Sequence, residues 1–188
     1  MDASTPHDDE QIVARIAVAR VTTLDGESVR LRELWRDSVA VTGFLRHFGC
    51  LFCHQMVDDL VAVVPEIVSR GSRAILIGNG SVEQARRFFQ SKGLPREGVV
   101  LGTDPERETY RAAELERGYT RTFLNPGSLR AFPVARKRGH RITGLFGDLT
   151  QLGGVLVTRP PASLLYLHRS KFAGDHPQIA DVLRALDG

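Results

Sequence analysis

Two cysteines, Cys50 and Cys53, are the residues of this sequence best suited to covalent chemistry. They are the only cysteines among 188 residues, and they stand three positions apart in the run FGCLFCHQM. A disulfide across so short a loop constrains an unfolded chain very little, so a structural role explains the pair poorly. In a reducing compartment a C-x-x-C pair is typical of thiol redox chemistry, which predicts a dithiol–disulfide cycle between the two sulfurs.

The position of the pair between two predicted elements supports this interpretation. The apolar, β-branched residues 39–45 predict a buried strand. A helical apolar period then begins near the cysteines, with Phe52, Met56 and Leu60 on one face. Cys50 would therefore lie at or near a helix N-terminus, where free backbone N–H groups and the helix dipole favour a thiolate.

Four residues are the candidate catalytic group: Cys50, Cys53, Arg46 and His47. Arg46 and His47 precede the turn and would add positive charge beside a Cys50 thiolate. Attack by that thiolate on a hydroperoxide or a disulfide would leave a sulfenic acid or a mixed disulfide on Cys50. Cys53, one helical turn further, would resolve it as a Cys50–Cys53 disulfide that an external thiol reduces.

Other interpretations of the same residues stay open. CLFCH matches the C-x-x-C-H haem-attachment pattern, which belongs to exported proteins, whereas the start MDASTPHDDE is acidic and unlike an export signal. Zinc would use His47, Cys50, Cys53 and His54, without the second cysteine pair of the stronger structural patterns. The cysteines would be inert if the fold served only to bind a partner. We expect no cofactor and no metal.

The bulk composition is that of a soluble globular protein, and the polar, acidic start MDASTPHDDE, unlike a signal peptide, leads us to expect it in the cytoplasm. The chain is 42% hydrophobic and 25% charged, its net charge is only +3, and no apolar run reaches membrane-spanning length. We therefore expect neither nucleic acid nor membrane as a partner. The charge is uneven, because the basic segment 117–147 holds seven Arg and Lys and no acidic residue. This segment would steer anions or shape a substrate entrance, or it is a solvated loop.

Alternating strands and helices predict an α/β fold with a central mixed sheet flanked by helices. Pro65 should kink or divide the helix that follows the cysteines, Ser81 should cap the next one, and Asp104 should start a helix that runs to about residue 117. The basic segment should be an insertion over one side of the sheet. A hairpin around RPPAS and a final helix capped near Asp175 complete a thioredoxin-like arrangement. We expect residues 1–10 to form a disordered tail and residues 11–188 a single domain.

Five segments of the chain resemble a known family. They are FLRHFGCLFC (44–53), TDPERETY (103–110), GSLRAF (127–132), GDLTQLGG (147–154) and LHRSKFAGDHP (167–177). The sequence resembles the peroxiredoxin-like branch of the alkyl hydroperoxide reductase / thiol-specific antioxidant (AhpC/TSA) family, within the thioredoxin-fold superfamily, from about residue 31 onward. The resemblance implies an antioxidant or thiol–disulfide oxidoreductase that uses Cys50 and Cys53. Its substrate would be a peroxide or a disulfide, and its reductant a thiol or a thioredoxin-type protein. A homodimer is compatible with this.

The chain departs from the family pattern at two places. Peroxiredoxins carry a Pro and a Thr or Ser before the attacking cysteine, at the positions of Gly43 and His47 here, and that hydroxyl helps to align the peroxide. Thioredoxins place a cis-proline before the hairpin, where this chain has Gly153-Gly154-Val155. These departures favour a slower or more selective reductase. A disulfide reductase without peroxidase activity is the alternative.

Overall fold

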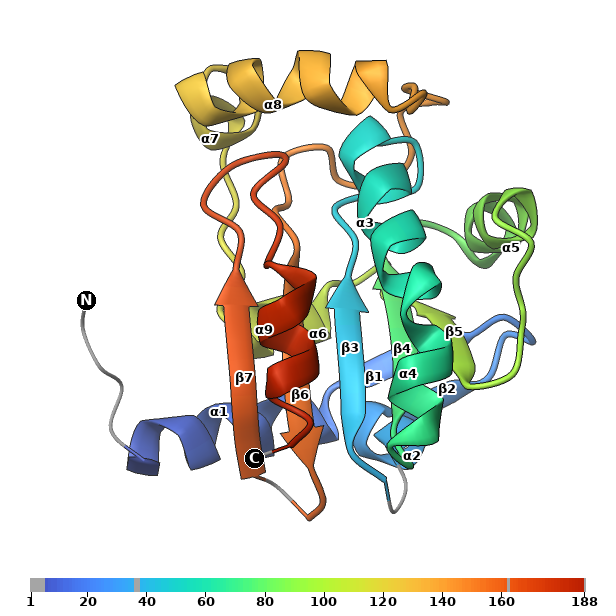
Figure 1. Cartoon of the computed structure of the whole chain (residues 1–188), viewed down its shortest axis with the longest axis vertical. Helices are drawn as coiled ribbons and strands as arrows, with labels where there is room; N and C mark the ends of the chain where they lie inside the picture. The colour runs from blue at the N-terminus through green and yellow to red at the C-terminus, as the bar shows by residue number, and fades with distance from the viewer. Residues whose placement is uncertain (1–5, 36–37, 162, 188) are drawn as a thin grey trace.

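A mixed seven-stranded sheet forms the centre of the computed structural model, which describes residues 6–35, 38–161 and 163–187. The strand order is β2-β1-β5-β4-β3-β6-β7. Figure 1 shows β7, β6, β3 and β4 side by side in front, with β1 and β2 behind them. The three central strands are parallel to one another: β3 (Ala40–Phe44), β4 (Arg73–Gly78) and β5 (Val99–Thr103). The antiparallel strands on either side are β1 (Arg20–Thr23), β2 (Ser28–Arg30), β6 (Gly154–Arg159) and β7 (Ser163–Arg169).

Helices cover both faces of this sheet and enclose two apolar cores. One core packs against α3 (Leu51–Ala62), α4 (Val64–Ser69), α5 (Val82–Ser91) and α9 (Ile179–Arg184). The other packs against α1 (Pro6–Val18), α2 (Leu31–Trp35) and α6 (Glu108–Ala112). Alternation along a strand divides the side chains between the cores: in β4, Leu76 enters the first, whereas Ile75 and Ile77 enter the second. The predicted α/β, thioredoxin-like fold is confirmed.

Local sequence signals explain several element boundaries. The predicted strand over residues 39–45 is β3, and its residues are all buried. Pro65 divides the long helical segment as predicted, because α3 ends at Ala62 and α4 carries the proline in its first turn. The Ser81 side chain accepts a hydrogen bond from the backbone N–H of Gln84 and completes a capping box at the start of α5.

Three predicted boundaries were wrong. Helix α1 begins at Pro6, so residues 6–10 are helical rather than part of a tail, and residues 1–5 lie outside the described residues. The Asp104 carboxylate does accept the Thr109 N–H, at 2.7 Å. However, Arg107 has a left-handed φ of 58°, so α6 is short and starts only at Glu108. The final helix has Gln178 as its N-cap, while Asp175 accepts a hydrogen bond from the Lys171 N–H.

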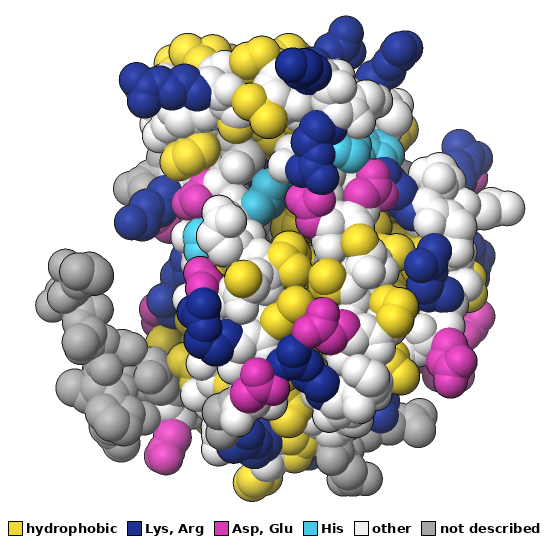
Figure 2. Space-filling model, in the orientation of Figure 1, with side chains coloured by type: hydrophobic (Ala, Val, Ile, Leu, Met, Phe, Trp, Pro, Cys, Tyr) yellow, Lys and Arg dark blue, Asp and Glu magenta, His cyan; other side chains and the backbone are white. Residues whose placement is uncertain are grey.

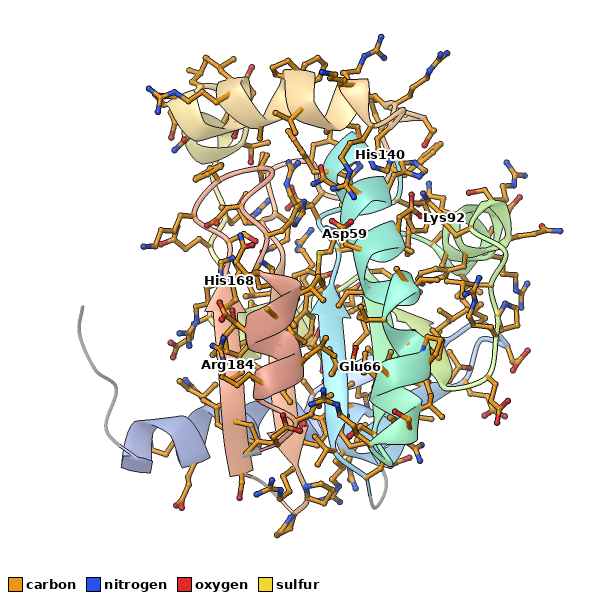
Figure 3. All side chains as sticks on the ribbon, in the orientation of Figure 1. Asp59, Glu66, Lys92, His140, His168 and Arg184 are labelled. Carbon is orange, nitrogen blue, oxygen red and sulfur yellow. The ribbon has the colours of Figure 1, made fainter. Side chains whose placement is uncertain are left out.

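The basic segment also lies elsewhere than predicted. It forms α7 (Tyr119–Phe123) and α8 (Pro126–Lys137), followed by a loop, and these cross the end of the sheet above α3 rather than covering one side (Figure 1). Arg138 contacts Asp59 at 2.5 Å, and His140 Nδ1 lies 3.6 Å from Asp58. Lys92, which follows α5, also contacts Asp58, at 2.8 Å. Figure 3 shows Asp59, Lys92 and His140 around α3. The contacts of Arg138 and His140 hold the basic segment against α3, and Lys92 joins the end of α5 to the same helix.

Replacing Tyr110 by Phe tests the packing at the end of β3. The buried Tyr110 hydroxyl donates to the carbonyl oxygen of Leu45 at 2.6 Å and lies 3.2 Å from that of Ile77. Its loss leaves a buried acceptor unpaired, and we expect the free energy of unfolding in urea to fall by about 1–3 kcal/mol. Tyr166→Phe is the control, because its hydroxyl makes no hydrogen bond with any residue in the described part of the chain. Equal stability of the two variants would contradict this account.

Candidate functional site

Cys50 is the N-cap of α3, as the sequence predicts. Its φ and ψ of −80° and 128° are extended, and its carbonyl oxygen accepts the N–H groups of Cys53 and His54 at 3.0 and 3.1 Å. The preceding Gly49 has no room for a side chain, since a Cβ there would lie 1.9 Å from the carbonyl oxygen of Gly144. The cysteine turn is therefore pressed against the loop that follows α8.

Arg46 contacts both sulfurs from a buried position. Its Nη1 donates to Cys50 Sγ at 3.0 Å, and its backbone N–H donates to Cys53 Sγ at 3.2 Å. The rest of the guanidinium is held by two carbonyl oxygens, those of Gln151 at 3.1 Å and Leu149 at 2.9 Å. With the side chain 6% exposed, this charge acts on the sulfur with little screening by solvent.

The two cysteines are in opposite electrostatic situations. Burial alone raises the pKa of Cys50, but the hydrogen bond from Cys53, the positive charge of Arg46 and a hydrogen bond from His47 outweigh it and hold that pKa well below its usual range. Burial raises the pKa of Cys53 well above its usual range, and the hydrogen bond to Cys50 and the charge of Cys50 raise it further. The arrangement favours a thiolate at Cys50 and a neutral thiol at Cys53.

His47 shapes the turn between Arg46 and Cys50. Its Nδ1 accepts the backbone N–H of Gly49 at 3.2 Å, and its carbonyl oxygen accepts the N–H of Cys50 at 3.3 Å. Because Nδ1 is an acceptor, a neutral ring carries its proton on Nε2. The ring also hydrogen-bonds Cys50 and contributes to the lowered pKa of its thiol. All four candidate residues therefore lie together.

An apolar cleft of about 180 Å³ opens over Cys50. The sequence did not predict this cleft. Arg46, His47 and Cys50 form its polar part. Its other lining residues are Leu51, Phe52, Thr122, Ser128, Leu129, Phe132, Ile142, Leu145, Leu149 and Ala173. Six of these ten come from α7, α8 and the following loop up to residue 147, where the apolar residues show no clear period. The one sequence signal that could have pointed to the cleft was the presence of these apolar residues within the strongly basic segment 117–147.

The zinc set considered above is not brought together as four ligands. His54 is turned away toward Thr143, whose Oγ1 lies 3.1 Å from its Nε2, and toward the ring of Phe88. Burial, with the charge of Lys92, lowers the pKa of His54 to about 4. Within residues 6–35, 38–161 and 163–187 there is no cluster of three or more His, Cys, Asp or Glu that could bind a metal ion.

Gly153, in the segment where the sequence leads us to expect the cis-proline of thioredoxins, is buried beside the end of β3. A Cβ on Gly153 would be 2.2 Å from the carbonyl oxygen of Phe44, so only glycine permits this close approach.

As for membrane insertion, none of the helices in the described part of the chain combines the length and apolarity needed to span a bilayer.

Known proteins are similar to this chain in sequence and in fold. The family described as AhpC/TSA antioxidant enzyme matches residues 59–171, a span that starts after the cysteines. Peroxiredoxin-like 2C of Mus musculus is 34% identical, over 89% of this chain and 78% of that protein. Prostamide/prostaglandin F synthase of Salmo salar is 31% identical, over 88% of this chain and 82% of that protein.

Solved structures agree on the fold. Xanthomonas campestris peroxiredoxin Q superposes with a TM-score of 0.63 at 17% identity, covering 93% of this chain and 92% of that one. An identity this low supports the fold alone. The sequence match and the shared fold together show that this chain belongs to the AhpC/TSA antioxidant enzyme family, as a peroxiredoxin-like protein of thioredoxin fold.

Proposed function

We propose that this protein is a thiol-dependent reductase of hydroperoxides, with Cys50 as the nucleophile and Cys53 as the resolving thiol. The observation that carries the proposal is the Arg46 guanidinium 3.0 Å from Cys50 Sγ, at the N-terminus of α3 and at the floor of a cleft. An anionic, buried sulfur facing a cavity is poised to attack an electrophilic oxygen or sulfur atom.

The cycle balances without any bound cofactor. The Cys50 thiolate attacks the terminal oxygen of R–O–O–H, the S–O bond forms and the O–O bond breaks. Cys50 becomes a sulfenic acid, and the leaving alkoxide takes a proton from solvent to give the alcohol. The Cys53 thiol then displaces the hydroxyl of the sulfenic acid, which leaves as water with the thiol proton, and the Cys50–Cys53 disulfide forms. A reducing thiol or a thioredoxin-type protein restores both thiols.

The apolar cleft favours an organic hydroperoxide over hydrogen peroxide as the substrate. Its walls are mainly Leu, Ile and Phe side chains, which can contact the apolar part of an organic hydroperoxide. Hydrogen peroxide has no apolar part for them to contact. Two similar proteins bear names that agree with this: the salmon relative is called a prostaglandin F synthase, and a bacterioferritin comigratory protein of Xanthomonas campestris is described by its alkyl peroxide reduction activity. Such a cycle requires a reducing compartment, for which we propose the cytoplasm.

A disulfide reductase without peroxidase activity is the second candidate. His47 stands where peroxiredoxins carry the hydroxyl that aligns a peroxide, so the usual group for orienting the O–O bond is missing. Stopped-flow oxidation of the reduced protein separates the two candidates. A rate with organic hydroperoxides no faster than that of free cysteine would eliminate the peroxidase and leave the disulfide reductase.

Replacing Arg46 by Gln tests the cause of thiolate formation. In a Cys53→Ser background, which isolates one thiol, we expect the rate of Cys50 alkylation by iodoacetamide at pH 6 to fall roughly tenfold, because the nearby positive charge is lost. The control is Arg32→Gln, which removes an exposed arginine far from the site. If alkylation is equally fast with and without Arg46, the guanidinium does not stabilise the thiolate.

Single cysteine variants test the assigned roles. Cys50→Ser should lose at least 99% of hydroperoxide turnover, since no nucleophile remains at the floor of the cleft. Cys53→Ser should still react once with cumene hydroperoxide, and dimedone should trap one sulfenic acid on Cys50, detected by mass spectrometry. Dimedone labelling of Cys53 in the Cys50→Ser protein, together with retained turnover, would reverse the assignment.

Replacing Phe132 by Ser tests the contribution of the cleft. A polar side chain in the wall should lower kcat/KM for cumene hydroperoxide by roughly tenfold through a higher KM, because apolar contact with the substrate is lost. The rate with hydrogen peroxide should stay unchanged. Val18→Ser, on α1, is the control for loss of an exposed apolar side chain. A parallel fall with both peroxides would show damage to the site rather than loss of substrate contact.

A further inference from the structure

Exposed apolar side chains gather on one end of the molecule. Of the nine large hydrophobic residues that are exposed in the described part of the chain, seven belong to α7, α8 and the following loop: Tyr119, Leu124, Leu129, Phe132, Val134, Ile142 and Leu145. Leu145 is 74% exposed and Leu129 64%. Side chains of this size in contact with water at one site are typical of an interaction surface.

The same end is strongly basic. Exposed cations stand among these apolar residues: Arg130, Arg136, Lys137, Arg138 and Arg141. Arg138 pairs with Asp59, whereas the structure gives the other four no ion pair with any described acidic residue. Figure 2 shows dark blue Lys and Arg beside yellow apolar atoms across the top of the molecule, over α7 and α8. We call this surface the basic–apolar face.

We propose that the basic–apolar face binds the surface of an anionic phospholipid bilayer. Helix α8 lies across the end of the sheet (Figure 1), and would rest in the plane of the lipid headgroups. Its exposed apolar side chains would enter the boundary between headgroups and acyl chains, while the unpaired cations would contact lipid phosphates and carboxylates. The proposal departs from the sequence-based expectation that the chain has no membrane partner, and vesicle binding decides between them.

Charge distinguishes a bilayer from a second copy of this chain. Two copies pairing through this face would bring two sets of unpaired arginine and lysine together, with no acidic residue in 117–147 to compensate them. An anionic bilayer provides the opposite charge and an apolar layer at once. A purely electrostatic partner such as nucleic acid would leave Leu124 and Val134 without a role.

The cleft over Cys50 opens on this same face. Leu129, Phe132, Ile142 and Leu145 are exposed and also line the cleft. A molecule dissolved in the bilayer would reach the cleft along apolar surface, without passing through water. The binding itself depends only on the face, and not on the thiol chemistry proposed above.

Vesicle sedimentation with the reduced full-length protein tests the proposal. We expect the protein to sediment with vesicles of phosphatidylcholine and phosphatidylserine, to bind pure phosphatidylcholine at least tenfold more weakly, and to be released by high salt. The Cys50→Ser protein should bind equally well, so a failure of the thiol cycle would not affect this result. Equal binding to both kinds of vesicle, or to neither, would overturn the proposal.

Two surface variants separate the contributions of charge and apolar contact. Arg136→Gln with Lys137→Gln should weaken binding to the anionic vesicles at least tenfold, and so should Leu124→Ser with Val134→Ser. None of these four residues lines the cleft. Arg30→Gln with Arg32→Gln is the matched control, since it removes two exposed arginines from β2 and α2 and should change nothing.

The variants also decide against the alternatives. Unchanged vesicle binding by either surface variant would overturn the proposal, because both interactions are required. Concentration-dependent dimerisation in sedimentation equilibrium, abolished by Leu124→Ser with Val134→Ser and accompanied by no vesicle binding, would assign the face to a second copy instead.

Discussion

A buried guanidinium held against a sulfur atom is the interaction on which this site depends. Arg46 has lost nearly all contact with water, so its charge must be compensated by the protein. Cys50 Sγ supplies one acceptor, and the carbonyl oxygens of Leu149 and Gln151 supply two more. Since neutral carbonyls do not cancel a full charge, the arrangement is most stable when Cys50 is the anion. The arginine and the thiolate therefore stabilise each other.

The segment that supplies those carbonyls is fixed by its own polar network. The Asp148 backbone N–H donates to the Asn79 side chain, whose amide nitrogen donates to the carbonyl oxygen of Arg46. The Asp148 carboxylate contacts Arg107 at 3.1 Å and Arg117 at 2.6 Å. Asn79, directly after β4, thus connects the central sheet to both the arginine and the loop that holds it. The geometry at the sulfur reflects contacts made along the whole end of the sheet.

The sequence was informative wherever a signal is local. Cys50 at a helix start, the interruption at Pro65 and the cap at Ser81 each depend on residues within one or two turns, and all three were predictable. The partners of Arg46 were not, because Leu149 and Gln151 stand more than a hundred residues away in the chain. Asn79 showed only the signature of a turn, although its side chain joins distant segments.

The position of the basic segment 117–147 was also beyond prediction from the sequence. Its charge was visible, but its position was not, because irregular apolar spacing does not indicate which surface a segment covers. Contacts of Arg138 and His140 with α3 help to fix that position, and they join residues about eighty positions apart in the chain. The expectation of a helix from Asp104 to about residue 117 was wrong for a related reason: the left-handed backbone at Arg107 is a conformation that arginine's propensity does not indicate.

The depth of the sulfur has a consequence for how the protein can be recycled. Cys50 is only 4% exposed, beneath the side chains of α8 and the loop after it. In the proposed cycle, a thiol of low molecular weight would reach Cys50 through the cleft, whereas the surface of a folded reductant would meet the covering side chains first. The contacts of Asp58 and Asp59, which hold the covering segment in place, would then oppose reduction by a large donor more than by a small one.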